Sequence, residues 1–388
     1  MANPVFHRPQ LADQMVRGLM ASAVGSATAS GLFLAAPRRT GKSTFVREDL
    51  RPALQTAGAI VMYVDLWANK QTDPETVIVA AVRAELSKHD GVVARLAKSA
   101  GLEKVAVGGV AFSLDRIGLG KEVSLSWALT ALSDETKKPI VLLIDEAQHA
   151  ITTEAGYDAL FALKAARDEL NSSEHHGLRI VAIGSNRDKL AMLRNSKDQA
   201  FFGAPLVSFP TLGQDYIEWF CEGVGLAGPL NPADVMKLFE RASFRPEIIG
   251  AAADALRFDF GLDPADVGAS FAKAVGEQIE EADVQTLRVI HALTPLQSAV
   301  LRVLAFEGDK YAPFETSTME SYRAVLESIA PDGTVTPEVS NVQQALIALQ
   351  DKSLVWKEKR GVYSLEESTT AELLREYGLL DVCAAPRA

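Results

Sequence analysis

One stretch of sequence decides the fold of the first half of the chain: Leu32-Phe33-Leu34-Ala35-Ala36-Pro37-Arg38-Arg39-Thr40-Gly41-Lys42-Ser43. It opens with an apolar β-run, and a helical pattern begins at Lys42. Between them the residues fit G-x-x-x-x-G-K-[ST], with Ala36 in place of the first glycine. Such a loop turns its backbone N–H groups toward phosphate oxygens at a helix N-terminus. The residues we assign to this phosphate-binding loop are Ala36, Pro37, Arg38, Arg39, Thr40, Gly41, Lys42, Ser43 and Thr44.

A second apolar run, about 100 residues later, ends in two acidic residues. Ile140–Ile144 is typical of a strand buried on both faces, and Asp145 and Glu146 follow it directly. Carboxylates placed there lie at the carboxyl edge of a parallel sheet, where such folds bind ligands. We expect Asp145 and Ser43 to hold Mg²⁺, Lys42 to stabilise phosphate charge and Glu146 to position the attacking water. As an isolated pair the two acids would equally suit a cap on the next segment; the upstream loop favours the catalytic interpretation.

The first 210 residues alternate short β-rich runs with longer helical patterns, which predicts a parallel α/β sheet. The expected strands are Gly31–Ala35, Ile60–Asp65, Ile140–Ile144, Ile180–Ile183 and Leu206–Phe209. The expected helices are Lys42–Thr56, Pro74–Lys88, Ser124–Glu135 and Tyr157–Asn171. Residues 103–119 are expected to form a Gly-linked pair of short strands. Residues 1–212 thus predict a P-loop NTPase core of the α/β class.

The pattern changes twice after this core. Residues 213–285 are helical throughout and predict a small helical lid. Residues 286–388 predict a winged-helix domain, in which three helices precede a hairpin that turns at Arg360-Gly361. The expected elements of this domain are the helices Pro295–Phe306, Thr316–Ile329 and Pro337–Asp351, and the hairpin Ser353–Leu365.

Composition narrows the class of protein. The chain has 388 residues and a net charge of −11, so any contact with nucleic acid would have to come from a local patch. The two cysteines, Cys221 and Cys383, lie far apart and predict neither a disulfide framework nor a zinc site. His175-His176 is interpreted as a solvated turn. Without a signal sequence or a long apolar run, we expect a cytoplasmic protein with no membrane partner.

The two motifs together resemble those of an AAA+ ATPase, of the prokaryotic and archaeal type related to the Orc/Cdc6 and STAND groups. Ile144-Asp145-Glu146-Ala147-Gln148 is similar to the second motif of these proteins, and Ala35 to Ser43 to their G-P-R-R-x-G-K-[ST] loop. Phe6-His7-Arg8-Pro9-Gln10 resembles their N-terminal F-x-x-R segment, which implies that Arg8 lies beside the adenine. The resemblance implies ATP and Mg²⁺ as cofactors, ATP hydrolysis as the reaction, and self-association.

The resemblance also implies residues that sense the γ-phosphate. The strand ending in Gly184-Ser185-Asn186-Arg187 is similar to sensor 1, with Asn186 as the expected contact and Ser185 as the alternative. Phe244-Arg245-Pro246-Glu247 resembles sensor 2, which would place Arg245 against the phosphates. The same stretch also fits an ordinary helix start with proline in its first turn.

Arg194 is the candidate arginine finger that would reach the nucleotide of a neighbouring subunit. Its position near the end of a helical segment fits a solvated arginine equally well. Related proteins often carry an arginine after an aromatic–glycine pair, and here that stretch is Phe202-Gly203-Ala204. The departure counts against that form of the finger.

Two features of the predicted winged helix suit DNA. Its third helix has an apolar stripe of Val339, Val342, Leu346 and Leu349. The amides of Gln343 and Gln344 point elsewhere and suit base edges. The hairpin tip carries Lys357, Lys359 and Arg360, which suit phosphates. The same fold also docks proteins, and the acidic balance of the chain favours that alternative.

We therefore expect an ATPase whose nucleotide state controls a conformational or assembly change, coupled to a winged-helix domain that contacts DNA. The alternative is a nucleotide-dependent signalling switch whose winged helix docks a protein partner. Turnover stimulated by DNA would favour the first, and slow turnover indifferent to DNA the second. A metabolic kinase is disfavoured, because no acceptor-substrate domain is evident beyond the lid and the winged helix.

Overall fold

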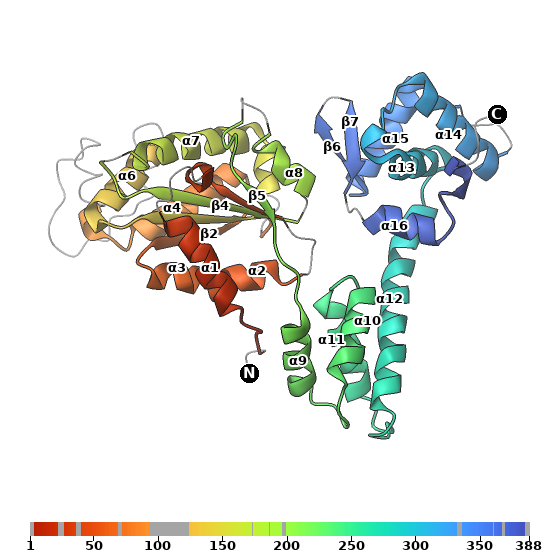
Figure 1. Ribbon diagram of the computed structural model, residues 1–388. Coiled ribbons are helices and arrows are strands. Elements are labelled where there is room, and N and C mark those ends of the chain that lie inside the picture. The colour runs from red at the N-terminus through yellow and green to blue at the C-terminus, as the bar shows by residue number, and fades with distance from the viewer. Residues whose placement is uncertain are drawn as a thin grey trace. The chain divides into compact units, whose positions relative to one another are not determined.

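The computed structural model forms two compact units, Met1–Phe220 and Cys221–Ala388 (Figure 1). It describes residues 4–21, 27–35, 40–68, 72–92, 124–172, 174–185, 187–195, 199–331, 336–359, 361–366 and 369–384. The pair of strands expected at residues 103–119 lies outside these ranges. Within them, we find no helix with the length and apolar character that a bilayer crossing requires.

The first unit is built on a five-stranded sheet with the strand order β2-β3-β4-β1-β5, in which all neighbouring strands are parallel. The strands are β1 (Leu32–Ala35), β2 (Ile60–Asp65), β3 (Ile140–Asp145), β4 (Leu178–Gly184) and β5 (Leu206–Ser208). The parallel α/β sheet predicted from the sequence is confirmed, with strand ends shifted by one or two residues. Because β4 lies between β1 and β3, the carboxyl ends of β1 and β3 flank the carboxyl end of β4.

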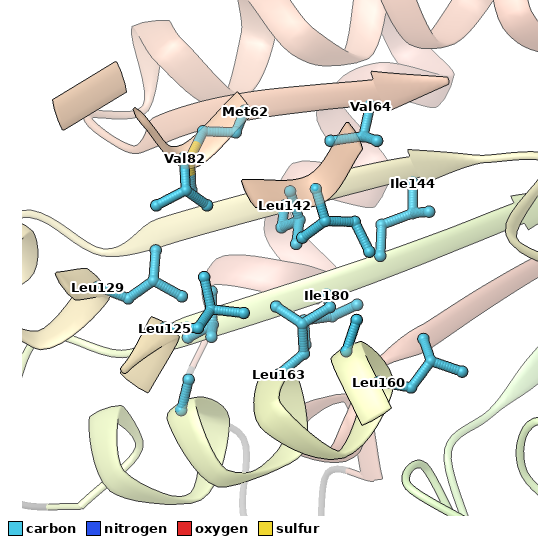
Figure 2. Packing of buried hydrophobic residues seen from close by; sticks show 14 of the residues in the cluster. Met62, Val64, Val82, Leu125, Leu129, Leu142, Ile144, Leu160, Leu163 and Ile180 are labelled. Atoms are coloured by element: carbon cyan, nitrogen blue, oxygen red, sulfur yellow. The ribbon is translucent and has the colours of Figure 1, made fainter. Parts of the chain in front are cut away.

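Alternate residues of the buried strands serve two separate cores, which explains why the strands are apolar on both faces. In β3, Ile140, Leu142 and Ile144 face one core, while Val141 and Leu143 face the other. The first core lies between the sheet and the helices α4 (Pro74–Leu86), α6 (Leu125–Thr136) and α7 (Glu154–Leu170), as Figure 2 shows for Leu142 and its neighbours. The second core lies between the other face of the sheet and two segments, α1 (Pro9–Met20) and the helical run Lys42–Thr56 that follows β1.

The helices of the first unit cover both faces of the sheet (Figure 1). They are α1 (Pro9–Met20), η1 (Ala27–Ser30), α2 (Lys42–Phe45), η2 (Val46–Leu50), α3 (Arg51–Thr56), α4 (Pro74–Leu86), α6 (Leu125–Thr136), η3 (Ala147–Thr152), α7 (Glu154–Leu170) and α8 (Arg187–Met192). The helix predicted at Lys42–Thr56 has the expected ends but contains one π turn, η2. Helix α1 was not among the expected elements.

Helix α9 (Gln214–Gly223) spans the division between the units, and the second unit continues with α10 (Pro232–Arg241), α11 (Pro246–Arg257) and α12 (Val267–His291). Helix α12 runs without a break through position 285, where the sequence predicts a domain boundary. The remaining elements are α13 (Pro295–Glu307), η4 (Gly308–Lys310), α14 (Thr316–Ile329), α15 (Val339–Asp351), β6 (Val355–Lys359), β7 (Val362–Leu365), α16 (Thr369–Glu376) and η5 (Asp381–Ala384).

The three helices and the hairpin expected after residue 295 are present, and β6 and β7 are antiparallel. They enclose their own core, which includes Tyr322, Val325 and Leu346. One expectation was wrong: Val339 does not belong to the buried stripe of α15, since it is 56% exposed. As the first residue of α15, it precedes the turns that pack against α13.

His175 is not the solvated side chain expected from the sequence. Its side chain is 13% exposed, and its Nδ1 lies 2.8 Å from the Asp134 carboxylate at the end of α6. Its Nε2 lies 3.6 Å from the Glu169 carboxylate on α7. The hydrogen bond with Asp134 raises the pKa of His175 above its usual value, against a smaller opposing effect of burial. The imidazole therefore links two helices to the loop before β4.

This linkage predicts a pH dependence of stability. The pKa of His175 is higher in the folded state than in the unfolded state. The protonated imidazole therefore stabilises the fold fully when the pH is below the unfolded-state pKa, and this stabilisation is lost as the pH rises through the folded-state pKa. The free energy of unfolding of wild type, minus that of His175→Gln, should be larger near pH 5.5 than near pH 8.5. The difference should stay within about 1 kcal/mol, since both carboxylates are partly exposed. Urea unfolding at both pH values measures the free-energy difference between wild type and His175→Gln, and His176→Gln is the control. A difference that does not change with pH would contradict the prediction.

Candidate active site

The loop after β1 ends at Gly41, whose backbone is left-handed with φ 80° and thereby directs the chain into α2. The helical run that starts at Lys42 continues through η2 and α3 to Thr56, so its N-terminus carries the partial positive charge of a long helix. Thr40 is buried, Ser43 half-buried and Thr44 exposed. The loop residues 36–39 lie outside the described ranges, so the assignments of Ala36, Pro37, Arg38 and Arg39 stay predictions.

Lys42 and the two acids after β3 lie together at the carboxyl edge of the sheet. The Lys42 Nζ donates to Asp145 Oδ1 at 2.9 Å and lies 3.7 Å from Glu146 Oε1. Lys42 is 5% exposed and Asp145 only 1%. Residues 103 positions apart in the sequence thus form a buried ion pair.

The Asp145 carboxylate is held in its charged form. Burial is the largest single influence and would raise the pKa of Asp145, but the positive charge of Lys42 and the hydrogen bonds that the carboxylate accepts together outweigh burial and lower the pKa below its usual value. Hydrogen bonds from Ser43, Lys42 and Tyr63 act in the same direction. A buried aspartate that stays ionised at neutral pH, beside a serine hydroxyl, is the pair of oxygen ligands expected for Mg²⁺. Asp145 and Ser43 therefore fit the metal assigned to them, with the remaining positions left to phosphate and water.

Tyr63 is a site residue that was not predicted from the sequence. It lies on β2, and its hydroxyl donates to Asp145 Oδ2 at 2.9 Å. The Arg47 Nε in turn donates to the Tyr63 hydroxyl at 3.2 Å, and the guanidinium lies over the tyrosine ring. Burial and the Asp145 charge raise the pKa of Tyr63 well above its usual value, so the hydroxyl remains a donor. No motif marks Tyr63, because its role follows from the pairing of β2 with β3.

The Glu146 carboxylate contacts Ser185, the residue that follows β4. Its Oε2 accepts hydrogen bonds from Ser185 Oγ at 2.9 Å and from the amide of Gln148. The backbone of Glu146 is left-handed, with φ 51°, which is uncommon for a residue with a side chain. Asn186, the expected sensor, lies outside the described ranges, and Ser185, the alternative, contacts the predicted catalytic acid.

Hydrogen bonds hold the N-terminal segment Phe6–Arg8 beside the helical run Lys42–Thr56. The His7 ring and the Arg8 N–H both contact the carboxylate of Asp49 in the π turn, at 2.7 and 3.1 Å. The Arg8 guanidinium donates to the Pro210 and Thr211 carbonyls after β5. Phe6 packs edge-on against Tyr216 of α9. Arg8 therefore organises the segment through backbone contacts, and its place beside adenine stays a prediction.

The roles predicted for Arg194 and Arg245 stay predictions. Arg194 follows α8, and its Nη1 donates to the Asn195 side chain at 3.2 Å. Its Nε is buried and has no hydrogen-bond partner within the part of the chain that the structure describes. Arg245 belongs to the second unit and precedes α11, where its Nε donates to the Ala242 carbonyl. The predicted helix start at Pro246 is confirmed.

The residues predicted to contact DNA lie on α15 and the β6–β7 hairpin. Gln344 is exposed, whereas the Gln343 amide donates to the Tyr363 hydroxyl of β7 at 3.3 Å. Lys357 is exposed and its Nζ lies over the Tyr363 ring. Lys359 ends β6; its side chain and the whole of Arg360 lie outside the described part of the chain.

Comparison with known proteins identifies solved structures that have a similar fold. No family model matches the sequence, and no curated protein matches it. A Walker-type ATPase of Pyrococcus abyssi matches at 15% identity and a TM-score of 0.51, over 95% of each chain. The ORC2 protein of Aeropyrum pernix in its ADP form matches at 16% identity and a TM-score of 0.55, over 97% of this chain and 94% of that one. The chain therefore shares the fold of the Walker-type ATPase of Pyrococcus abyssi and of the ORC2 protein of Aeropyrum pernix.

The same Aeropyrum pernix protein in ADPNP–ADP complexes matches at 16% identity and a TM-score of 0.50, over 97% of this chain and 92% of that one. The resemblance drawn from the two sequence motifs is therefore confirmed at the level of the fold.

Proposed function

We propose that the chain binds Mg²⁺-ATP and hydrolyses it. The observation that carries this proposal is the buried contact of Lys42 with Asp145 and Glu146, beside the N-terminus of a long helical run. A lysine and a helix N-terminus bind phosphate, and an ionised aspartate with a serine hydroxyl binds a divalent cation. The ADP and ADPNP forms of ORC2, which share this fold, support a nucleotide as the ligand.

The proposed chemistry is attack of water on the γ-phosphate. Lys42 and the N–H groups of the loop stabilise charge on the phosphate oxygens. Asp145 and Ser43 would hold Mg²⁺, which would neutralise negative charge on the phosphate oxygens when bound. Glu146 positions the water and accepts its proton, and Ser185 stands beside it at the end of β4.

Arg8 is proposed to hold the segment that borders the base, and Asn186 and Arg245 to sense the γ-phosphate. Arg194 is proposed as the finger that completes the site of a second copy, so that ATP promotes self-association. The steady-state rate of phosphate release, measured with and without duplex DNA, tests the central proposal. Turnover that requires both ATP and Mg²⁺ is expected, and the absence of turnover under every condition contradicts the proposed function.

For residues 286–388 we propose a winged helix that contacts DNA. The order of three helices and a hairpin supports it, as do exposed Gln344 on α15 and exposed Lys357 on β6. One observation favours the alternative, a protein partner: Val339 and Ile347 are 56% and 48% exposed, two turns apart on α15. Positions i and i+8 of a helix fall within one broad apolar stripe, which suits a docked protein.

The two alternatives differ in their response to the hairpin cations. If the hairpin contacts DNA, replacing Lys357, Lys359 and Arg360 with alanine should weaken binding to all sequences, because phosphate contacts carry no sequence information. The log–log salt slope should fall by roughly 0.9 for each phosphate that these side chains no longer neutralise. Gln344→Ala should instead change sequence preference and leave the slope nearly intact.

Fluorescence anisotropy on duplex DNA over a salt series, with ATP present, measures these effects. Replacement of three exposed cations of the other helices, Lys237, Lys273 and Arg288, provides the control and should leave binding unchanged. If wild type does not bind duplex DNA even at low salt, a protein-docking role is favoured and the signalling switch becomes the better description.

A further inference from the structure

Gln148 lies two residues after the predicted catalytic acid, and the proposed function assigns it no role. It belongs to the short helix η3 and is only 4% exposed. Its amide nitrogen donates to Glu146 Oε2 and lies 3.4 Å from Ser185 Oγ. Ser185 Oγ donates to the same carboxylate oxygen. Two donors, from η3 and from the end of β4, thus converge on one oxygen of Glu146.

The orientation of the Gln148 amide has an energetic consequence. With its nitrogen directed at the carboxylate, its Oε1 is buried and has no hydrogen-bond partner among the described residues. A buried acceptor without a donor is unfavourable, whereas a hydrogen bond to an ionised group is stronger than a neutral one. The charge of Glu146 therefore determines which way the amide faces. A side chain that served only to fill space would not need this arrangement.

Gly184 makes room for this amide. A Cβ at Gly184 would lie 2.3 Å from Gln148 Oε1 and 2.9 Å from the Leu190 side chain. Gly184 does not have a positive φ, so its backbone conformation does not require glycine. The residue next to Ser185 on β4 is thus small because the Gln148 amide occupies the space.

We propose that Gln148 is a positioning residue that acts through Glu146, a role that rests on the proposed ATP hydrolysis. Gln148 and Ser185 together hold Oε2 of the Glu146 carboxylate in one place, while the other carboxylate oxygen, Glu146 Oε1, remains near Lys42. The left-handed backbone at Glu146 starts the turn that brings Gln148 back over the carboxylate. Gln148 does not contact the reacting atoms, and its effect is on the geometry of the group that does.

Gln148→Met tests this role, because methionine has a similar length and lacks the donor. The kcat for ATP should fall about 10- to 100-fold, by analogy with the loss seen when a hydrogen-bond partner that orients a metal ligand is removed. The KM for ATP and the melting temperature should change little, since Lys42 and Asp145 are untouched. Gln55→Met, at an exposed position of α3, is the matched control and should keep wild-type kcat. A wild-type kcat in Gln148→Met would overturn the proposal.

Gly184→Ala is the second variant, because it displaces the amide without removing its donor. A similar loss of kcat is expected, with circular dichroism confirming that the variant is folded. If Gly184→Ala fails to fold, Gln148→Met alone decides, and if Gln148→Met fails to fold, Gly184→Ala decides. A folded Gly184→Ala variant with wild-type kcat would contradict the positioning role.

A double-mutant comparison separates positioning from a general structural role. In the Glu146→Gln background, Gln148→Met should cause no further loss in single-turnover hydrolysis, because the group it positions is already absent. An equal loss in both backgrounds would show that Gln148 acts independently of Glu146. If wild type hydrolyses ATP in a Lys42-dependent manner and Gln148→Met matches it, only the positioning role fails. If wild type does not hydrolyse ATP, the proposed function fails and this role with it.

Discussion

Lys42→Ala should bind ATP about 100-fold more weakly than wild type, and its turnover should be undetectable. The loss of a charge-assisted hydrogen bond to phosphate accounts for roughly 3 kcal/mol, and each 1.4 kcal/mol corresponds to tenfold in affinity. Isothermal titration calorimetry with ATP and Mg²⁺ measures the affinity. An unchanged dissociation constant would show that Lys42 does not contact the phosphates.

The same substitution removes the counter-charge of a carboxylate that is 1% exposed, so it also lowers the free energy of unfolding. Lys42→Arg keeps the positive charge near Asp145 but places it on a larger, planar group, so it should fold and still lose ATP affinity. Lys237→Ala removes an exposed lysine of α10 and should behave as wild type. Together the two variants separate a loss of phosphate binding from a loss of folded protein.

Glu146→Gln should bind ATP with nearly wild-type affinity and lose about 10²- to 10⁴-fold in kcat. The amide preserves the shape of the side chain but cannot accept the proton of the attacking water, and general-base catalysis contributes that much. Calorimetry gives the affinity, and phosphate release gives kcat. Turnover within a few-fold of wild type would remove Glu146 from the proposed mechanism.

An exposed carboxylate provides the control for this variant. Glu222→Gln on α9 changes the net charge by the same amount, and its kcat should equal that of wild type. If Glu146→Gln no longer binds ATP, its assigned role would also be wrong, because the carboxylate would then contribute to the ground state. If Glu146→Gln binds ATP without hydrolysing it, light scattering on this variant can measure whether bound ATP promotes self-association.

The parallel sheet and the position of the nucleotide motifs could be predicted because their signals are local. An apolar run such as Ile140–Ile144 identifies a strand buried on both faces, and its order along the chain with helical patterns predicts parallel pairing. Gly41 before Lys42 predicts a turn into a helix, and the structure has it, with φ 80° at Gly41. The π turn after Phe45 could not be predicted, because propensities do not distinguish it from an α-helix.

What the sequence by itself determined is the identity of the groups that carry charge at the site: Lys42, Asp145 and Glu146. What only the tertiary structure decided is which uncharged groups hold them in place. Tyr63 reaches Asp145 because β2 pairs with β3, and Ser185 reaches Glu146 because β4 lies next to β3. These contacts join residues 82 and 39 positions apart. No local pattern marks such contacts, since they depend on strand order and register, which are set by the packing of the whole sheet.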